Sequence, residues 1–210
     1  MVNIKIKGLH VLTDRELVKP KSIVEVIKLA IEGGAAAIQL RDKDASDEEM
    51  IALGKKILEL TTGRVPLIVN DNVQVALAIG ADGVHVGQKD IPADQVRKLI
   101  DPNMILGVSV STVEQARQAE SDGANYLGVG PIFPTQTKTD ADPPIGLGGL
   151  ANIREAVSLP IIAIGGIKKR NVAQVMQFAH GIAVISAVLR AKNPLLATQK
   201  LAIIINKYKI

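Results

Sequence analysis

The sequence predicts an α/β protein built from eight strand–helix units, and three observations support this fold class. Short apolar runs rich in β-branched residues alternate with helix-like segments along the whole chain. The runs are almost continuously apolar, as is typical of parallel strands buried on both faces. The segments GAAAIQL, GADGVHV and GANYLGV repeat one theme, Gly-Ala followed by a strand. This repeat favours a closed (β/α)8 TIM barrel over the alternative, a doubly wound open sheet.

The strands are expected at the apolar runs, and none of the segments between them is a Pro/Gly/Ser-rich linker. We therefore expect one domain over residues 1–210. The predicted strands are LHVLTD (9–14), AAIQLRD (36–42), PLIVND (66–71), GVHVGQ (83–88), MILGVSV (104–110), ANYLGVGP (124–131), PIIAIGGI (160–167) and GIAVISAV (181–188).

Three of the intervening helices carry clear start signals. Ser22 opens SIVEVIKLAIEGG, which ends in a glycine pair suited to a C-terminal cap. Ser46 opens SDEEMIALGKKILEL, and Glu49, three residues on, predicts a capping box. Thr112 opens TVEQARQAESDG, which also closes on glycine. Helices with such boundaries fit between the strands of a barrel.

The composition narrows the class of protein. Hydrophobic residues make up 47% of the chain and aromatic residues 2%, so the core must be aliphatic. So few aromatic side chains argue against single-stranded nucleic-acid binding, which relies on base stacking. The absence of cysteine excludes disulfides and thiolate catalysis. The apolar run at 181–189 is shorter than the ~20 residues of a membrane span. We expect a soluble cytoplasmic protein with no nucleic-acid or membrane partner, and a homo-oligomer remains open.

The second predicted strand leads into a candidate anion site. The active site of such a barrel lies at the carboxyl ends of its strands. Gln39, Arg41 and Lys43 alternate there, so they share one face and would point into the barrel mouth. Buried cations are unfavourable without a partner, which suggests an anionic ligand. The alternative is a set of salt bridges with Asp14, Asp42 or Asp71.

Two aspartates follow neighbouring predicted strands. Asp71 ends LIVND, and Asp90 closes GVHVGQKD. Magnesium is held by one or two carboxylates together with water and substrate phosphate oxygens, so this pair is a candidate Mg²⁺ site. The alternative is capping of the next helix, especially for Asp90, which precedes IPADQV.

The last two predicted strands suggest a phosphate site. Gly165 and Gly166, expected just before a helix, would let backbone N–H groups approach an anion, and Ile185 and Ser186 lie on the next predicted strand. Phosphate is usually held at this position in the fold. The alternative is a tight turn that needs glycine. The basic run 168–170 is expected to be solvated surface.

The three histidines are weak catalytic candidates. His85 lies between Val84 and Val86 and is more typical of a hydrogen-bonded core residue. His10 comes early in the first strand, away from the active rim. His180 begins the last strand, at the opposite end of the barrel.

Eight short motifs follow one another over almost the whole chain: QLRDK (39–43), LIVND (67–71), GADGVHVGQKD (80–90), ILGVSV (105–110), YLGVGPIFPTQTK (126–138), GLGGL (146–150), IAIGGI (162–167) and AVISAV (183–188). In this order the motifs resemble those of a known family, the thiamine phosphate synthases. The resemblance implies a (β/α)8 barrel that joins a pyrimidine methyl diphosphate to a thiazole phosphate, or its carboxylated precursor, with Mg²⁺ and release of pyrophosphate.

The resemblance also implies a role for each matching residue. Asp71 and Asp90 match the magnesium ligands. The residues that match contacts to the pyrimidine diphosphate are Gln39, Arg41, Lys43, Asn70, Ser109 and Lys138, and those implied in catalysis are Arg41, Lys43, Ser109 and Lys138. The residues that match contacts to the thiazole phosphate are Thr135, Gln136, Thr137, Gly165 or Gly166, Ile185 and Ser186.

One position departs from the family pattern, and two other functions were weighed. Ser111 stands where the family often has histidine. A thiazole tautomerase shares the fold, but it places a histidine where this chain has Pro131, and it lacks the paired aspartates. The other alternative is a non-enzymatic protein that binds thiamine precursors. Rim charges that need a ligand argue against it.

Overall fold

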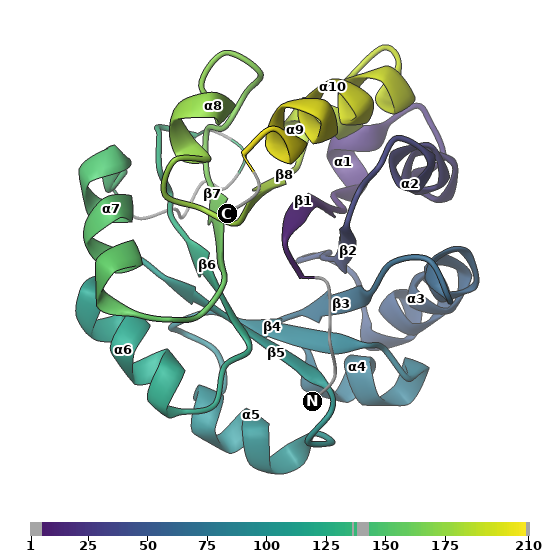
Figure 1. Ribbon diagram of the computed structural model, residues 1–210. Coiled ribbons are helices and arrows are strands. Elements are labelled where there is room, and N and C mark those ends of the chain that lie inside the picture. Colours follow the sequence, from purple (N-terminus) through teal and green to yellow (C-terminus); the bar gives the residue numbers. More distant parts are fainter. Residues whose placement is uncertain (1–5, 136, 138–142, 209–210) are drawn as a thin grey trace.

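The computed structural model describes residues 6–135, 137 and 143–208. Parallel strands close into a barrel in sequence order, with β8 paired to β1 (Figure 1). The TIM-barrel prediction is therefore confirmed, and the open sheet is excluded. The strands are β1 (Gly8–Leu12), β2 (Ala37–Leu40), β3 (Leu67–Asn70), β4 (Gly83–Val86), β5 (Ile105–Val110), β6 (Tyr126–Val129), β7 (Ile161–Ile164) and β8 (Gly181–Val184).

Helices surround the strands on the outside of the barrel (Figure 1). The capping box is confirmed, because the Ser46 side chain accepts from the Glu49 backbone and the Glu49 side chain accepts from that of Ser46. Thr112 caps the helix it was expected to open. The helices are α1 (Arg15–Val18), α2 (Ile23–Glu32), α3 (Asp47–Thr61), α4 (Val73–Ile79), α5 (Ala93–Leu99), α6 (Val113–Ser121), α7 (Gly146–Ala156), α8 (Val172–Val175), α9 (Ser186–Leu189) and α10 (Pro194–Asn206).

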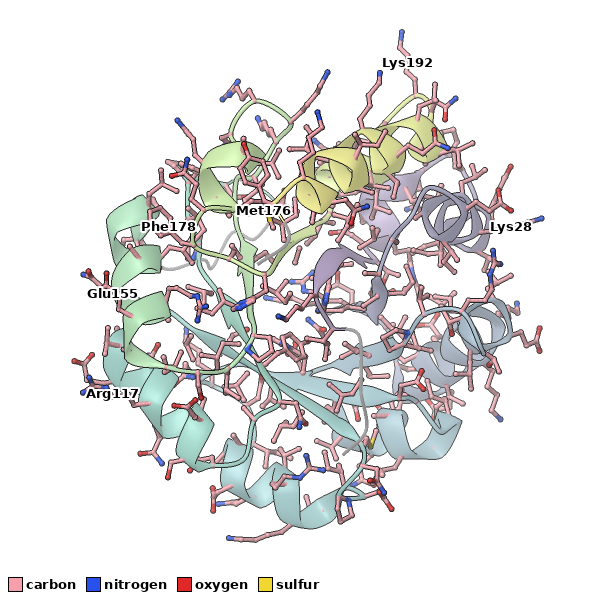
Figure 2. All side chains as sticks on the ribbon, viewed as in Figure 1. Lys28, Arg117, Glu155, Met176, Phe178 and Lys192 are labelled. Carbon is pink, nitrogen blue, oxygen red and sulfur yellow. The ribbon has the colours of Figure 1, made fainter. Side chains whose placement is uncertain are left out.

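The core has two layers, as the alternation of strand side chains requires. A large aliphatic cluster joins the outer faces of the strands to the helices. A smaller cluster lies inside the barrel and is mostly aliphatic, formed by Ile6, Leu12, Ala37, Ile68, Ile105, Tyr126, Ile162 and Ala183. The outer surface of the helices is polar. The charged side chains labelled in Figure 2 (Lys28, Arg117, Glu155 and Lys192) point into solvent there.

Two predictions at the last strands were wrong. Ser186 was expected within the eighth strand, but β8 ends at Val184 and Ser186 is the first residue of α9. The strand ends because Ile185 has φ −117° and ψ −83°, outside the β region. A helix was also expected directly after Gly166, whereas α8 begins at Val172. Of these two strands, β8 is the one that is followed closely by a helix, because α9 begins two residues after its end.

None of the helices in the described ranges is long and apolar enough to cross a membrane.

Glycine on β5 allows two aromatic rings to enter the barrel. A Cβ atom on Gly107 would lie 2.3 Å from Nδ1 of His85 and 2.3 Å from Cζ of Tyr126. Distances this short are not compatible with van der Waals contact, so a side chain here would displace both rings.

We predict that Gly107→Ala destabilises the protein by about 1–3 kcal/mol, because an added Cβ would push both rings out of their hydrogen-bonded positions. The matched control is Gly148→Ala in α7, where an added Cβ meets nothing within 4 Å. This control should be neutral or stabilise the protein by up to about 1 kcal/mol. Urea unfolding of both variants measures the difference. Equal stability of the two would show that the rings do not depend on Gly107.

Candidate active site

A large cavity opens where the strands end, with a volume of about 1420 Å³. Every predicted site residue that the structure describes lines it: Gln39, Arg41, Lys43, Asn70, Asp71, Asp90, Ser109, Thr135, Thr137, Gly165, Gly166, Ile185 and Ser186. The other two, Gln136 and Lys138, lie outside the described residues. Drug-sized ligands usually occupy pockets of roughly 300–1,000 Å³, so this space suits two small substrates together.

The backbone at Arg41 is fixed by the end of β1. The buried Thr13 hydroxyl donates to the Arg41 carbonyl at 2.8 Å and accepts from the Arg41 N–H at 2.8 Å. Among the described residues, the partly buried Arg41 guanidinium has no hydrogen-bond or ion-pair partner. A cation in this position favours an anionic ligand.

Two of the three carboxylates considered as salt-bridge partners are engaged elsewhere. Asp42 pairs with Nε of Arg15 at 2.8 Å. Asp14 caps α1 by accepting from the N–H groups of Glu16 and Leu17. The expected alternative, a local salt-bridge set around Arg41, therefore loses these two carboxylates.

Hard oxygen atoms gather at the ends of β3 and β4. Asp71 directly follows β3 and, with φ 67°, is the only described non-glycine residue with a positive φ. Such strained conformations are typical of functional sites. Beside it, Oδ1 of Asn70 is buried without a hydrogen-bond partner among the described residues. A buried polar oxygen in this position is suited to a ligand or an ion.

Asp90 does not cap a helix. The residue at the N-cap of α5 is Pro92, and Oδ2 of Asp90 accepts from the Gly87 N–H at 2.7 Å. The described residues contain no group of three or more metal-type side chains. Magnesium needs only one or two carboxylates, because water and substrate phosphate complete its octahedron. Asp71, Asp90 and the orphaned Asn70 oxygen are therefore a donor set that fits this ion.

The loop after β6 runs along the end of β7. Ile132 N–H donates to the Ile164 carbonyl at 2.9 Å, and Phe133 N–H donates to the Gly165 carbonyl at 3.1 Å. Gly165 (φ 98°) and Gly166 (φ 63°) both have left-handed backbones. A Cβ atom at Gly166 would lie 2.7 Å from the Pro134 carbonyl oxygen. The tight-turn interpretation thus holds at both glycines, and it is compatible with a phosphate site.

Two hydroxyls from distant parts of the chain meet beside this turn. The Thr137 hydroxyl donates to Oγ of Ser186 at 3.4 Å. Ser186 is also the first residue of α9, and (β/α)8 barrels often hold phosphate at a short helix in this position. The predicted phosphate residues are therefore brought together, although Ser186 arrives from a helix and not from a strand.

A row of buried polar side chains forms the floor of the cavity. Nε2 of Gln39 lies 3.1 Å from Nδ1 of His10 and 3.2 Å from the Tyr126 hydroxyl. His85 joins that hydroxyl through Nδ1 at 2.8 Å and Oγ of Ser109 through Nε2 at 2.8 Å. His85 is a hydrogen-bonded core residue, as expected. His10 was expected to lie away from the active rim; it does not line the cavity, but it contacts Gln39, which does.

Sequence reasoning missed Tyr126 and the cations at the mouth. Tyr126 is fully buried at the floor of the cavity, and its inward place on β6 was the available signal. The run 168–170 is exposed, as expected, yet Lys168 and Lys169 line the cavity together with Arg190 and Lys200. Ser111 instead supports the start of α6, because its N–H and hydroxyl both donate to Gln115.

The fold and the site together define the class of protein, a (β/α)8-barrel enzyme that acts on phosphorylated small molecules. Cations, hard oxygen atoms and glycine turns, the groups that suit such substrates, lie at the mouth of its barrel. Comparison with known proteins identifies the family. The sequence model of the family described as thiamine monophosphate synthase matches residues 9–188. The chain belongs to this family.

Individual relatives agree. A thiamine-phosphate synthase of Roseiflexus castenholzii is 56% identical over 194 residues, which cover 91% of this chain and 85% of that protein. One from Roseiflexus sp. is 52% identical over 198 residues, covering 93% and 84%. The solved structure of a thiamine phosphate pyrophosphorylase from Pyrococcus furiosus superposes with a TM-score of 0.87 at 44% identity and covers 96% of each chain.

The buried imidazole of His10 makes stability depend on pH. Burial lowers the pKa of His10 from 6.5 to about 4, against the opposing effect of its hydrogen bond to the Ile6 carbonyl. Because the folded pKa lies below the unfolded one, the unfolded chain binds the proton more readily. The stabilisation is complete above pH 6.5 and is lost as the pH falls toward 4, by up to about 3 kcal/mol.

We predict that His10→Asn removes this part of the pH dependence, so the difference in unfolding free energy between the variant and the natural protein shrinks as the pH falls from 7 to 4. Urea titrations at several pH values measure it. Burial also lowers the pKa of His180, but His180 is present in both proteins and cancels in the difference. Parallel pH profiles would contradict the account.

Proposed function

We propose that this chain catalyses the thiamine-phosphate synthase reaction at the mouth of the barrel. The pyrimidine substrate is 4-amino-2-methyl-5-(diphosphooxymethyl)pyrimidine. The thiazole substrate is 4-methyl-5-(2-phosphooxyethyl)thiazole or its carboxylated precursor. The products are thiamine monophosphate and pyrophosphate, together with CO2 when the carboxylated thiazole is the substrate. One observation carries the proposal: residues matching both substrate sites of the family line a single cavity.

Cations on the β2 side suit the pyrimidine diphosphate. Arg41 presents a planar set of donors that matches phosphate oxygens in bidentate fashion, and Lys43 adds a compact charge. Gln39, Asn70 and Ser109 then supply neutral hydrogen-bonding groups around the same substrate. Lys138 completes this set in the proposal, next to the leaving diphosphate.

The proposed metal is Mg²⁺, held by Asp71 and Asp90. When bound, it would neutralise the negative charge that develops on the departing pyrophosphate. The carboxylates bring hard oxygen ligands to the cavity wall.

The thiazole phosphate belongs on the opposite side, at the ends of β7 and β8. Backbone N–H groups beside Gly165 and Gly166 can approach a phosphate closely because glycine has no side chain in the way. The hydroxyls of Thr137 and Ser186 already meet there. In the proposal, Thr135, Gln136 and Ile185 complete this subsite.

The reaction is a substitution at the pyrimidine methylene. The bond between this carbon and the diphosphate oxygen breaks, and the electron pair leaves with pyrophosphate. The aminopyrimidine stabilises the resulting benzyl-like cation, and the lone pair of the thiazole nitrogen forms the new carbon–nitrogen bond. No general base is needed, so the protein contributes positioning and charge stabilisation.

The two other functions are less well supported. A tautomerase needs a base near the loop after β6, and Pro131 at the cavity wall cannot serve as one. A protein that only binds precursors would not need carboxylates beside a diphosphate site. We also place the reaction in the cytoplasm, because its phosphorylated substrates enter a hydrocarbon layer only at high free-energy cost.

We predict that Asp71→Asn lowers Mg²⁺-dependent pyrophosphate release by about 100-fold or more, because a ligand charge is lost at the leaving group. Asparagine tolerates the left-handed backbone, so the fold should be kept. The matched control is Asp94→Asn in α5, where the partly exposed carboxylate pairs with Lys98 at 3.0 Å. The control should turn over normally. Full activity of Asp71→Asn, or of the natural protein in excess EDTA, would refute the metal assignment.

A further inference from the structure

The polar row under the cavity is a continuous hydrogen-bonded relay, formed by His10, Gln39, Tyr126, His85 and Ser109. Its first four side chains are at most 6% exposed. Apolar residues could fill the same space without any need for partners. Packing alone therefore does not explain this buried row of polar side chains, and the direction of its hydrogen bonds is the property to consider.

The direction of the relay is fixed at its far end. Nε2 of His10 lies 2.6 Å from the Ile6 carbonyl oxygen, which can only accept, so this nitrogen carries the proton. The low pKa of buried His10 keeps the ring neutral at pH 7, which leaves Nδ1 as an acceptor. Gln39 must then turn its amide nitrogen toward His10, and its second N–H reaches the Tyr126 hydroxyl.

The same logic carries through to the cavity. The Tyr126 oxygen accepts from Gln39, and burial raises the pKa of Tyr126, so its proton stays and is donated to Nδ1 of His85. With Nδ1 accepting, His85 carries its proton on Nε2 and donates it to Oγ of Ser109. The proton of the Ser109 hydroxyl is left to point into the cavity that this residue lines.

Two glycines keep room for the relay. A Cβ atom on Gly128 would lie 2.8 Å from Cε1 of His85 and 3.2 Å from its Nε2. Gly107 clears the other side of this ring and the ring of Tyr126 in the same way. Strands β5 and β6 thus leave space for the His85 ring between Tyr126 and Ser109.

We propose that His10 is a positioning residue that, acting through the relay, fixes the Ser109 hydroxyl as a hydrogen-bond donor toward the pyrimidine substrate. The contact between Ser109 and that substrate rests on the function proposed above. The partner on the substrate is an acceptor, either a ring nitrogen or a diphosphate oxygen. Both N–H groups of Gln39 donate within the relay, to His10 and Tyr126. Gln39 therefore offers the substrate only its carbonyl oxygen, which can accept from the exocyclic amino group of the pyrimidine.

Without the acceptor at residue 10, the relay can reverse. The Gln39 amide is free to turn over and present its oxygen to Tyr126. Tyr126 then donates to Gln39 and accepts from His85, which moves its proton to Nδ1. Nε2 of His85 becomes an acceptor and takes the Ser109 proton, so the substrate loses its donor.

The test compares two variants that separate this role from packing. His10→Phe keeps the ring volume but removes the acceptor, whereas His10→Asn loses volume but places a carbonyl oxygen where Nδ1 lies. We expect His10→Phe to lower the single-turnover rate by about 10- to 100-fold, as for loss of one substrate hydrogen bond, and His10→Asn to recover most of it. A role in packing alone predicts the opposite order and would overturn the inference.

The coupling to Ser109 is measured by a double-mutant cycle. Ser109→Ala should slow turnover, and adding His10→Phe should slow it little further, because the two changes remove the same donor. Additive losses, or a Ser109→Ala variant as fast as the natural protein, would overturn the inference. The control His180→Asn, at the opposite end of the barrel, should leave the rate unchanged.

A readout on the substrate-free protein separates this inference from the proposed function. The chain has three histidines. The ¹⁵N signals of their rings can therefore be assigned by comparing the natural protein with His10→Phe and His180→Asn. We expect His85 to be protonated on Nε2 in the natural protein and on Nδ1 in His10→Phe. Protonation of His85 on Nδ1 in the natural protein would end the relay model. Failure of the proposed reaction would appear separately, as absence of pyrophosphate release.

Discussion

Closure of the parallel barrel is the constraint on which the rest of the structure depends. Because β8 pairs with β1 and every strand runs the same way, the carboxyl ends of all strands meet at one mouth. Residues as distant in the chain as Arg41 and Ser186 therefore line one cavity. In the proposed function, two phosphorylated substrates bind in this cavity, each against its own set of donors.

Inside the barrel, the same geometry sets where polar residues are tolerated. The inner layer is largely aliphatic, and the polar relay interrupts it along a path that leads to Ser109. Each member finds a partner, which limits the unfavourable free energy of burying polar groups. The hydrogen-bonded floor can orient a substrate, whereas the more exposed charges around it attract the phosphates.

The sequence predicted the barrel and most of the cavity wall because both depend on local signals. Apolar runs mark buried strands, and polar residues at their ends mark the mouth. The eighth strand was predicted too long because Ile185 is apolar, and its backbone turns away from the sheet for reasons that an apolar pattern does not contain. The link from His10 to Gln39 was missed because it joins neighbouring strands through side chains that face inward, and the sequence does not give their register.

The central claim, that one cavity holds both phosphate subsites, is tested most directly by a crystal structure with pyrophosphate, Mg²⁺ and thiamine monophosphate bound. The account predicts pyrophosphate against Arg41 and Lys43, the metal between Asp71 and Asp90, and the thiazole phosphate beside Gly166 and Ser186. Either anion bound outside this cavity, or both bound on the same side of it, would contradict the claim.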